Sequence, residues 1–571
     1  MPPSLPVLLG SLELAREDDL PDLSSIEESY RNPDPFWALL AAGSAIPGLA
    51  PPKSRFGERY DLYYDLVLRH LAARRIALRW YDKRTGWQAL SYEELNARSA
   101  AQAGAWLTQG VQPGARLAIV LPFGPETVLA LLTALRLGAC VSLLPPLGDQ
   151  FLARRLKKLA PAHIVTAPAH RPLLGPFDKA PLLLTDSTAP GRARAFDGSH
   201  TYLREDPCAA LYSPLREPLT DPALLSAHDA YRFPLRDALL TFLLRPGDHL
   251  AAPGFHPTQH QPALLFAALL AGATYLHLPP EALAANPALL REHPLRSLGL
   301  TPELRDVLLK KPAGPLANVH HWFKNPEERL DADEWRAFIQ AHALDHALVS
   351  NVLVDAARGG VVLGSVRRPA SLHTKVLPAA GVPFRLFDVA APTREPPPEA
   401  GLFAPGVAKK PPPDAYILLS RPGREFFYGG TLPPRRAGRI YPVDEVLAAL
   451  GELPFVAGAS VVAAPRGRAP SAHDFVLLVF TGAEETESAA EQGPGRHQAI
   501  TRAITLHLGA EHLPDRVELY PLYPRRYKDG QVDHAACAAE YLSGTLSRKA
   551  QTPMFLRLAA LRRVLTEGGP R

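Results

Sequence analysis

The sequence predicts an α/β protein with a doubly wound sheet, and one continuous stretch shows the pattern most clearly. The apolar run at residues 117–121 is bounded by Pro122 and Gly124 and has the composition of a buried parallel strand. A helix is expected at about residues 125–137, and a second strand follows at residues 139–144. Strand, helix and strand in this order form the repeating unit of a doubly wound sheet.

The sequence also predicts where the helix before this unit begins. Ser91 followed by Glu94 is a capping box, in which the two residues exchange side-chain to backbone hydrogen bonds. Leu95 to Trp106 then place apolar and small residues at helical spacing, up to the glycine-containing turn at residues 110–114. The spacing predicts an amphipathic helix that ends at this turn.

Length and composition exclude several classes of protein. A chain of 571 residues indicates several domains, and 47% hydrophobic with 21% charged residues is ordinary for a globular chain with large cores. The net charge of +5 is dispersed along the chain, so no nucleic-acid partner is expected. The most apolar run, residues 263–276, is too short to span a membrane. Three widely spaced cysteines favour a reducing cytoplasm over a disulfide framework or a zinc site.

Residues 90–146 resemble the N-terminal segment of the adenylate-forming superfamily, which includes acyl-CoA synthetases, firefly luciferase and peptide-synthetase adenylation domains. The motifs RPGD at residues 245–248 and LLAGAT at residues 269–274 follow in the order that the superfamily shows. The resemblance implies a large N-terminal domain of stacked β-sheets sandwiched by helices and a small C-terminal α/β lid domain. It divides the chain into an N-terminal extension, an AMP-binding-like domain and a lid, at residues 1–60, 61–430 and 431–571.

The superfamily holds the triphosphate of ATP in a loop rich in Ser, Thr and Gly that ends in Pro-Lys-Gly. The resemblance places this loop after residues 206–213, but residues 214–222 contain no glycine. Glu217 and Asp221 would repel phosphate, and each proline in the loop removes an amide donor. Arg216 is the candidate for a nucleotide contact here, and an exposed loop arginine is the alternative.

The superfamily also carries a Thr-Glu pair, whose glutamate places Mg²⁺ on the phosphates. The matching positions here are Ala356 and Ala357, just before Gly359 and Gly360. Asp355 is the candidate substitute as a metal ligand, and a solvated or capping aspartate is the alternative. The resemblance therefore implies that no metal is bound.

The resemblance also indicates a substrate pocket, to which it assigns Phe255 and His256 after one strand and Gly359 and Gly360 after another. His256 and His260 have the spacing of metal ligands on a helix, but flanking prolines argue against a helix at this place. A pocket-lining role for His256 is the expectation.

Two further positions concern the nucleotide and the lid. The ribose-binding Asp of the superfamily lies about fifteen residues before a Gly-Arg dipeptide, and Asp414 stands fifteen residues before Gly429, with Gly430 in place of the arginine. Asp414 is therefore the candidate ribose ligand, and an aspartate that forms a turn after the proline-rich run is the alternative. The lid lysine of the superfamily contacts the carboxylate and the α-phosphate during adenylation. Its position here is Gln531, and Lys528 is the candidate substitute.

Losses at four separate motifs predict an AMP-dependent ligase-like protein that has lost adenylation chemistry and acts as a binding, scaffold or regulatory protein in acyl or natural-product metabolism. No cofactor is expected. The expected ligand is an acyl or aryl carboxylate or thioester, and the expected protein partner is a carrier protein or an intact ligase. The alternative is a divergent acyl-CoA ligase or acyl-transfer enzyme that uses ATP, Mg²⁺ and CoA, with Arg216, Asp355 or Lys528 in the lost roles. A third hypothesis is an enzyme that uses the acyl pocket without ATP.

Overall fold

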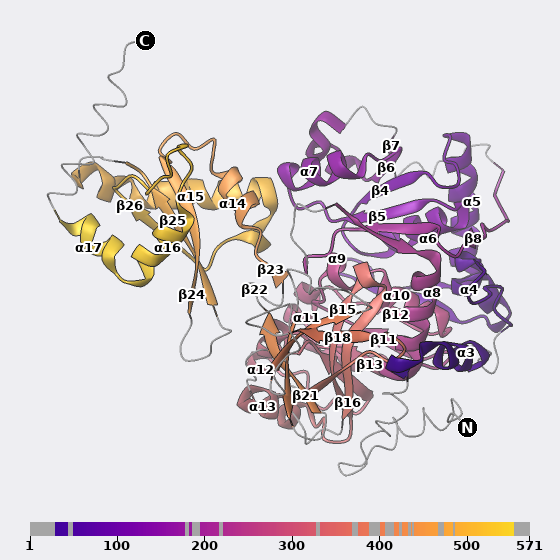
Figure 1. Ribbon diagram of the computed structural model, residues 1–571. Helices are drawn as coiled ribbons and strands as arrows, with labels where there is room; N and C mark the ends of the chain where they lie inside the picture. The colour runs from indigo at the N-terminus through magenta and orange to yellow at the C-terminus, as the bar shows by residue number, and fades with distance from the viewer. Residues whose placement is uncertain are drawn as a thin grey trace. The chain divides into compact units, whose positions relative to one another are not determined.

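The chain forms two compact units (Figure 1). The large unit comprises Met1–Pro146, Leu156–Pro172 and Phe177–Leu432, and the C-terminal unit comprises Leu147–Arg155, Leu173–Pro176 and Pro433–Arg571. The division at residues 60 and 430 that the sequence suggests stays a prediction. The computed structural model describes residues 29–43, 50–177, 182–184, 194–215, 221–326, 332–367, 375–387, 400–405, 416–421, 425–431, 435–436, 439–465, 473–482 and 486–552.

The first sheet of the large unit has six strands in the order β10-β9-β5-β4-β6-β7. All neighbours run parallel except β10, which pairs antiparallel with β9 at the edge. The strands are β4 (Arg116–Val120), β5 (Cys140–Leu144), β6 (His163–Thr166), β7 (Leu182–Leu184), β9 (Pro207–Leu211) and β10 (Ala223–Ser226). The helices α5 (Tyr92–Thr108) and α6 (Pro125–Leu137) pack on each other. The strand, helix and strand predicted from the sequence are therefore present.

The capping box at the start of α5 is also present. The Ser91 hydroxyl accepts a hydrogen bond from the Glu94 amide at 3.1 Å, and the Glu94 carboxylate accepts one from the Ser91 amide at 2.8 Å. At the other end of α6, Gly138 has a φ of 80°, the left-handed conformation that ends many helices. Local sequence signals thus define both helices.

The second sheet of the large unit has thirteen strands in the order β18-β19-β20-β21-β17-β16-β15-β14-β13-β11-β12-β2-β3. From β2 to β15 neighbouring strands are parallel, and the remaining pairs are antiparallel. The parallel strands are β2 (Ile76–Asp82), β12 (Thr274–His277), β11 (His249–Ala251), β13 (Leu295–Gly299), β14 (Val319–Lys324) and β15 (Leu348–Asp355). The antiparallel strands are β3 (Gly86–Ser91), β16 (Gly360–Arg367), β17 (Lys375–Pro378), β18 (Phe384–Phe387), β19 (Ala400–Pro405), β20 (Tyr416–Arg421) and β21 (Glu425–Thr431).

Helices cover both faces of the thirteen-stranded sheet. On one face, α6, α8 (Ala227–Arg236), the π-helical turn η3 (Asp237–Thr241) and α10 (Ala263–Leu270) share one core with strands of both sheets. On the other face, a second core lies under α11 (Pro280–Ala285), η4 (Pro287–Arg291), α12 (Pro302–Lys310) and α13 (Ala332–His342). Large buried side chains such as Trp322 and Trp335, stacked at 5.3 Å, fill the second core. The mixed α/β fold class predicted from the sequence is confirmed.

Segments near the N-terminus pack into the first core. The chain there forms α3 (Pro33–Gly43), β1 (Arg59–Tyr60), α4 (Leu62–Leu66) and η1 (Leu68–Ala73), and β1 pairs with β8 (Tyr202–Leu203). Phe36, Trp37 and Leu40 of α3 are buried. The indole nitrogen of Trp37 donates to the carbonyl of Gly381 at 2.9 Å. This part of the chain is therefore integral to the large unit.

The C-terminal unit contains the three-stranded sheet β24-β25-β26 with helices on both faces. Its strands are β24 (Gly458–Pro465), β25 (His473–Phe480) and β26 (Arg516–Tyr520), and the small pair β22 (Arg435–Arg436) and β23 (Arg439–Ile440) precedes them. Its helices are α14 (Val443–Ala449), α15 (Thr486–Leu508), η6 (Ala510–His512), α16 (His534–Leu542) and α17 (Thr545–Gln551). Val462, Val476 and Leu478 lie in the core that α16 and α17 cover.

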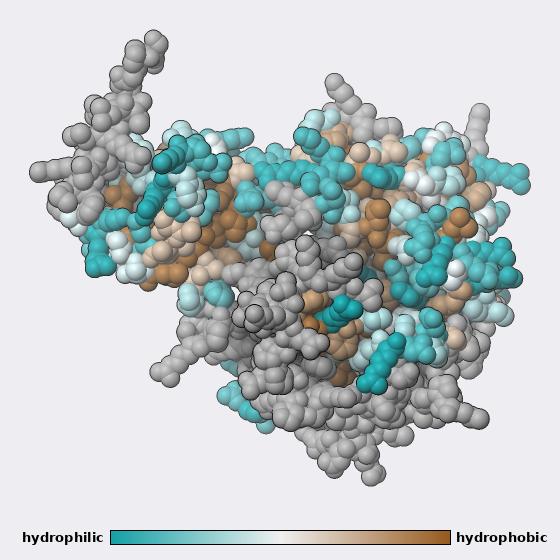
Figure 2. Space-filling model, viewed as in Figure 1, coloured by the Kyte–Doolittle hydropathy of each residue, from teal (hydrophilic) through white to brown (hydrophobic). Residues whose placement is uncertain are grey.

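Within the described residues, no helix has both the length and the apolar character needed to cross a membrane. The face shown in Figure 2 intersperses hydrophilic and hydrophobic residues over the described parts of both units. Nowhere in these described residues do three or more His, Cys, Asp or Glu side chains come together in a way that could hold a metal ion.

Candidate functional site

Five neighbouring parallel strands of the large sheet, β12, β11, β13, β14 and β15, end at one edge. In open α/β sheets, ligands bind outside the carboxyl ends of the strands. Phe255 and His256 follow β11, Thr301 follows β13, and Asp355 is the last residue of β15. The structure therefore places the residues predicted from two distant parts of the sequence at the same edge.

Direct contacts join these segments. A β-carbon added at Gly254 would lie 3.2 Å from the hydroxyl oxygen of Thr301. Gln259 of α9 (Pro257–His260) donates from its side-chain amide to the carbonyl of Val354 at 3.3 Å. The turn after β11 is thereby held beside the end of β15.

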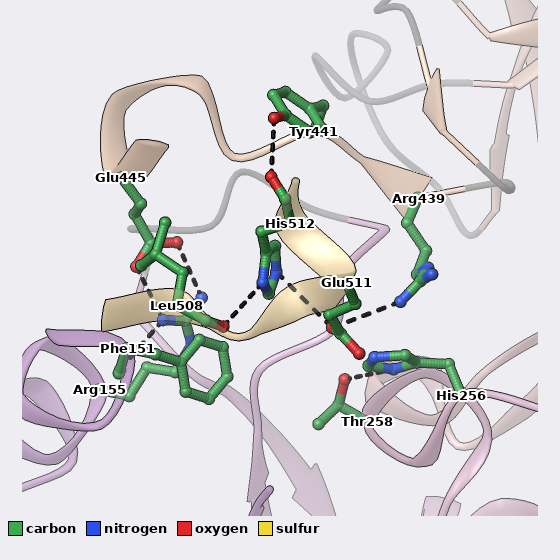
Figure 3. A network of polar contacts seen from close by, with 10 residues as sticks. All are labelled: Phe151, Arg155, His256, Thr258, Arg439, Tyr441, Glu445, Leu508, Glu511 and His512. Atoms are coloured by element: carbon green, nitrogen blue, oxygen red, sulfur yellow. Dashed lines mark hydrogen bonds and ion pairs between the residues drawn. The ribbon is translucent and has the colours of Figure 1, made fainter. Parts of the chain in front are cut away.

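His256 stands immediately before α9 and organises this short helix. Its ring Nδ1 is hydrogen-bonded to the Thr258 hydroxyl at 2.9 Å, and its carbonyl oxygen contacts the ring Nδ1 of His260 at 2.9 Å (Figure 3 shows the Thr258 contact). The helix exists despite its flanking prolines, because Pro257 occupies its first position, where no amide donor is needed. His260 is buried and turns its ring towards the backbone of its own helix.

Phe255 packs in an aromatic cluster. Its ring centroid lies 4.6 Å from that of His260 and 5.3 Å from that of Phe323 at the end of β14, and Phe323 in turn lies 5.0 Å from Phe242. A β-carbon at Gly299 would come within 2.9 Å of the Phe255 ring. The cluster forms a close-packed apolar wall at the strand edge. The pocket-lining roles of Phe255 and His256 stay predictions.

Asp355 has structural partners for both of its carboxylate oxygens. Its Oδ1 accepts a hydrogen bond from the Ala357 amide at 3.1 Å, and its Oδ2 lies 3.4 Å from the Arg358 Nε. The side chain is 2% exposed. Asp355 thus caps the 3-10 turn η5 (Ala356–Arg358), in which Ala356 and Ala357 are buried. This geometry is that of a capping aspartate, the alternative that the sequence left open.

Gly359 and Gly360 face helix α8. Gly359 has a φ of 89°, and an added β-carbon would lie 2.6 Å from the Phe233 ring. At Gly360, an added β-carbon would lie 2.2 Å from Oδ2 of Asp237, which accepts a hydrogen bond from the Val361 amide at 2.7 Å. Both glycines therefore permit close approach of the strand β16 to α8 and η3. Their assignment to a substrate pocket stays a prediction.

The first residues of the expected phosphate loop contact each other. The Ser213 hydroxyl accepts a hydrogen bond from the amide of Leu215, which is fully buried. Asp221, at the far end of the loop, lies 3.3 Å from the Lys158 ammonium in an exposed ion pair. Arg216 and Asp414, the two nucleotide-binding candidates, lie outside the described residues.

Gln531 and Lys528 lie on one exposed turn of the C-terminal unit. The Tyr527 amide donates to the Gln531 carbonyl at 2.8 Å, and the Gln531 amide donates to the Asp529 carboxylate at 3.0 Å. Gly530 has a φ of 87°, which allows the chain to reverse. The structure therefore brings Gln531 and Lys528 together, as their spacing suggests.

One residue at the strand edge is absent from the predictions. His277 ends β12, and its ring centroid lies 5.7 Å from that of Phe123, in the loop after β4. Burial lowers the pKa of His277 to about 4, and the nearby Glu281 opposes this shift only in part. The imidazole is therefore neutral at physiological pH. A single histidine after an apolar strand is too common a pattern to have indicated this position.

A family model described as AMP-binding enzyme matches residues 69–211. The 3-hydroxypropionyl-coenzyme A synthetase of Sulfurisphaera tokodaii is 30% identical over 160 residues, which cover 25% of this chain and 24% of that protein. Acetyl-coenzyme A synthetase 2 of Pseudomonas putida is 32% identical over 126 residues, 20% of each chain. The matched part thus spans about a quarter or less of these relatives' length.

The solved structure of a fatty acyl-adenylate ligase from L. pneumophila, in complex with acyl adenylate and pyrophosphate, is similar over far more of the chain. The similarity has a TM-score of 0.60 and covers 84% of this chain and 96% of that chain. Residues 69–211 are thus similar to AMP-binding enzymes, and the fold of most of the chain is similar to that of this ligase. At 13% identity the structural likeness shows the fold alone. The adenylate-forming fold thus extends well beyond the segment in which sequence similarity is found.

Proposed function

We propose that this relative of the adenylate-forming superfamily has lost adenylation chemistry and acts as a binding, scaffold or regulatory protein. The proposal rests mainly on the residue types at positions 356 and 357 and on the contacts of the neighbouring Asp355. The positions of the superfamily's Thr-Glu pair are the buried Ala356 and Ala357, and the adjacent carboxylate is engaged by the Ala357 amide and Arg358. A Mg²⁺ ion at Asp355 would have to share this carboxylate with the Ala357 amide and the Arg358 guanidinium.

The exposed turn of the C-terminal unit supports the same proposal. At the position of the lid lysine, Gln531 offers no positive charge to a developing phosphate charge. Removal of one such electrostatic group typically costs about a hundredfold or more in rate. Because the metal glutamate and the lid lysine are both replaced, little adenylation activity is expected.

The proposed ligand and the proposed partner follow from the chemistry of the superfamily. We propose an acyl or aryl carboxylate or thioester as ligand and a carrier protein or an intact ligase as partner, with no need for ATP, Mg²⁺ or CoA. We also propose the cytoplasm as location, because the three cysteines are buried free thiols.

The first prediction tests this proposal with ATP–pyrophosphate exchange across a panel of carboxylates. We expect no exchange by the unmodified protein, and none by Gln531→Lys, because a lysine acts on a phosphate that other groups must first position. An acetyl-CoA synthetase serves as the positive control for the assay. Calorimetric titration with ATP and Mg²⁺ shows separately whether nucleotide is bound. Robust exchange by the unmodified protein would overturn the proposal.

The second candidate function is a divergent acyl-CoA ligase, and the exposure of Lys528 on the same turn as Gln531 favours it. In that case exchange is measurable, and Lys528→Ala abolishes it while Lys528→Arg retains part of it. The matched control is Arg548→Ala on α17, which removes another exposed cation of the same unit.

A further inference from the structure

A cluster of basic and aromatic side chains lies near the amino ends of β11 and β13, at the opposite end of these strands from the candidate site. Arg79 comes from β2, His249 is the first residue of β11, and His293 lies two residues before β13. All three side chains are half-buried. Three segments that are far apart in the sequence thus contribute basic groups to one region of the large unit.

Strand register places Arg79 and His249 on the same face of the thirteen-stranded sheet. Arg79 is level with Leu276 of β12, and Leu276 is level with Ala251 of β11. Leu276 and Ala251 are both buried in the second core, so this face is the one that α11, α12 and α13 cover. Because side chains alternate along a strand, His249, two residues before Ala251, faces the same way.

His293 reaches this face from the connection between η4 and β13. Its ring centroid lies 6.1 Å from that of His249, with the ring planes inclined by 10°, and 4.4 Å from that of Trp87 on the edge strand β3. Trp87 in turn packs on Tyr81 at 5.5 Å and donates from its indole nitrogen to the Glu292 carboxylate at 2.5 Å. These side-chain contacts hold the connection over the sheet.

The basic side chains carry nitrogen atoms that the protein itself does not satisfy. Among the described residues, Arg79 Nε and His293 Nε2 are buried atoms without a hydrogen-bond partner. Within the same ranges no carboxylate forms an ion pair with Arg79, and the nearby Glu292 bonds to Trp87 instead. Buried polar groups in native proteins nearly all have a partner, which for groups of this kind is an ordered water molecule or an ion.

Burial and like charges keep both imidazoles neutral at physiological pH. Burial, together with the nearby His293 and Arg79, lowers the pKa of His249 to about 4. Burial and Arg79 also lower the pKa of His293, and Glu292 opposes this shift in part. Protonation of either ring adds a positive charge beside Arg79, and a bound anion would offset that charge. An anion would therefore bind with uptake of protons, and its affinity would rise as the pH falls.

We propose that Arg79, His249 and His293 form a binding site for a small tetrahedral oxyanion, such as inorganic phosphate. Arginine presents several N–H donors in a fixed fork, and each imidazole adds a donor from another segment. Donors from three segments suit a tetrahedral ion better than a planar carboxylate, which the fork of one arginine can bind alone. The site is independent of the proposed loss of adenylation, since it lies at the other end of the strands and requires no nucleotide.

The second prediction tests the site by calorimetric titration of the full chain with sodium sulfate, with sodium chloride at matched ionic strength as the reference. Sulfate keeps its charge between about pH 5.5 and about pH 8, so histidine is the group whose titration should change the affinity over this range. We expect saturable binding that is at least about threefold tighter at the lower pH. Titration with inorganic phosphate and with glycerol phosphate then distinguishes a free ion from a phosphate ester as the tighter ligand.

Variants locate the binding. Arg79→Gln should weaken sulfate binding about tenfold or more, because it removes a charged hydrogen-bond donor. His249→Gln should reduce the pH dependence, because one of the two titrating rings is lost. The matched control is Arg84→Gln in the exposed turn between β2 and β3, which should change the affinity by less than about twofold.

A second variant at the same position guards against a failure to fold. Arg79→Lys keeps the positive charge but lacks the planar fork, so a smaller loss of affinity than for Arg79→Gln is expected. The absence of saturable sulfate binding by the unmodified protein would contradict the site. Equal affinities of the Arg79 variants and Arg84→Gln would contradict it as well.

Discussion

Two segments where the resemblance places ATP-handling residues differ in how the fold uses them. Asp355 to Gly360 of the large unit is buried, and its side chains and glycines are engaged by α8, η3 and the turn itself. Tyr527 to Gln531 of the C-terminal unit is an exposed turn that is closed mainly by its own backbone. The first segment has become part of the core structure, whereas the second is a surface feature.

This difference indicates how each segment responds to mutation. A buried, engaged segment transmits a substitution into the packing of its neighbours, because protein interiors are close-packed. An exposed turn absorbs most substitutions with little change in stability. Restoring a superfamily residue is therefore expected to be costly at the strand edge and nearly neutral on the turn.

The third prediction, with the largest expected effect on stability, concerns Gly360→Ala. The new β-carbon would lie 2.2 Å from Oδ2 of Asp237, so either Asp237 or the strand must move. We expect the large unit to lose about 3 kcal/mol, as for an overpacked core site. Urea denaturation followed by tryptophan fluorescence measures this loss, because all six tryptophans precede residue 336 and lie in the large unit.

The control is Gly364→Ala in the same strand, where the nearest atom to an added β-carbon is Cγ1 of Val361 at 3.3 Å. It should cost less than about 1 kcal/mol. Equal losses at the two glycines would show that the contact with Asp237 does not explain the packing of this segment.

The fourth prediction concerns the cap at the start of η5. Asp355→Ala removes the acceptor of the Ala357 amide and the ion-pair partner of Arg358, and should destabilise the large unit by about 1–2 kcal/mol. Asp355→Asn keeps an oxygen for the amide and should cost less, by the same fluorescence measurement. A larger loss for Asp355→Asn than for Asp355→Ala would argue against the capping role.

The smallest effect is expected on the exposed turn, in the fifth prediction. Lys528→Ala should change the stability of the C-terminal unit by less than about 0.5 kcal/mol, as for most surface positions. Hydrogen exchange of β24, β25 and β26 is the measurement, because the tryptophans do not report on this unit. Gly530→Ala, at a φ of 87°, should cost about 1 kcal/mol and shows that the assay detects strain at the turn. A large loss for Lys528→Ala would remove the contrast between the two segments.

The predictions that the structure confirms were made from sequence patterns of neighbouring residues. The capping box of Ser91 and Glu94 and the strand, helix and strand after it depend on residues close in sequence, and all are present. The packing of Gly360 on Asp237 was not predictable, because the two residues are 123 positions apart and an isolated glycine pair has many explanations.

The same reason limits prediction of the candidate site. The residue types around Asp355 suggested either a metal ligand or a cap, and the cap depends on the positions of the Ala357 amide and Arg358, which the sequence does not give. Asp237 and Val361, whose amide donates to the Asp237 carboxylate, are separated by 124 residues. Pairing over such a distance depends on the tertiary fold and leaves no local sequence signal.

The packing of α3 has a consequence for synthesis of the chain on the ribosome. The indole nitrogen of Trp37 donates a hydrogen bond to the carbonyl of Gly381, which lies 344 residues later in the chain. A β-carbon added at Gly381 would lie 2.5 Å from the Phe36 ring. At about 5–20 residues per second, the helix therefore waits roughly 20–70 seconds for this partner to be translated. During that interval the aromatic side chains of α3 lack the part of their native cover that Gly381 provides. A nascent chain stalled before residue 381 would thus be a natural client for chaperones that bind exposed aromatic segments.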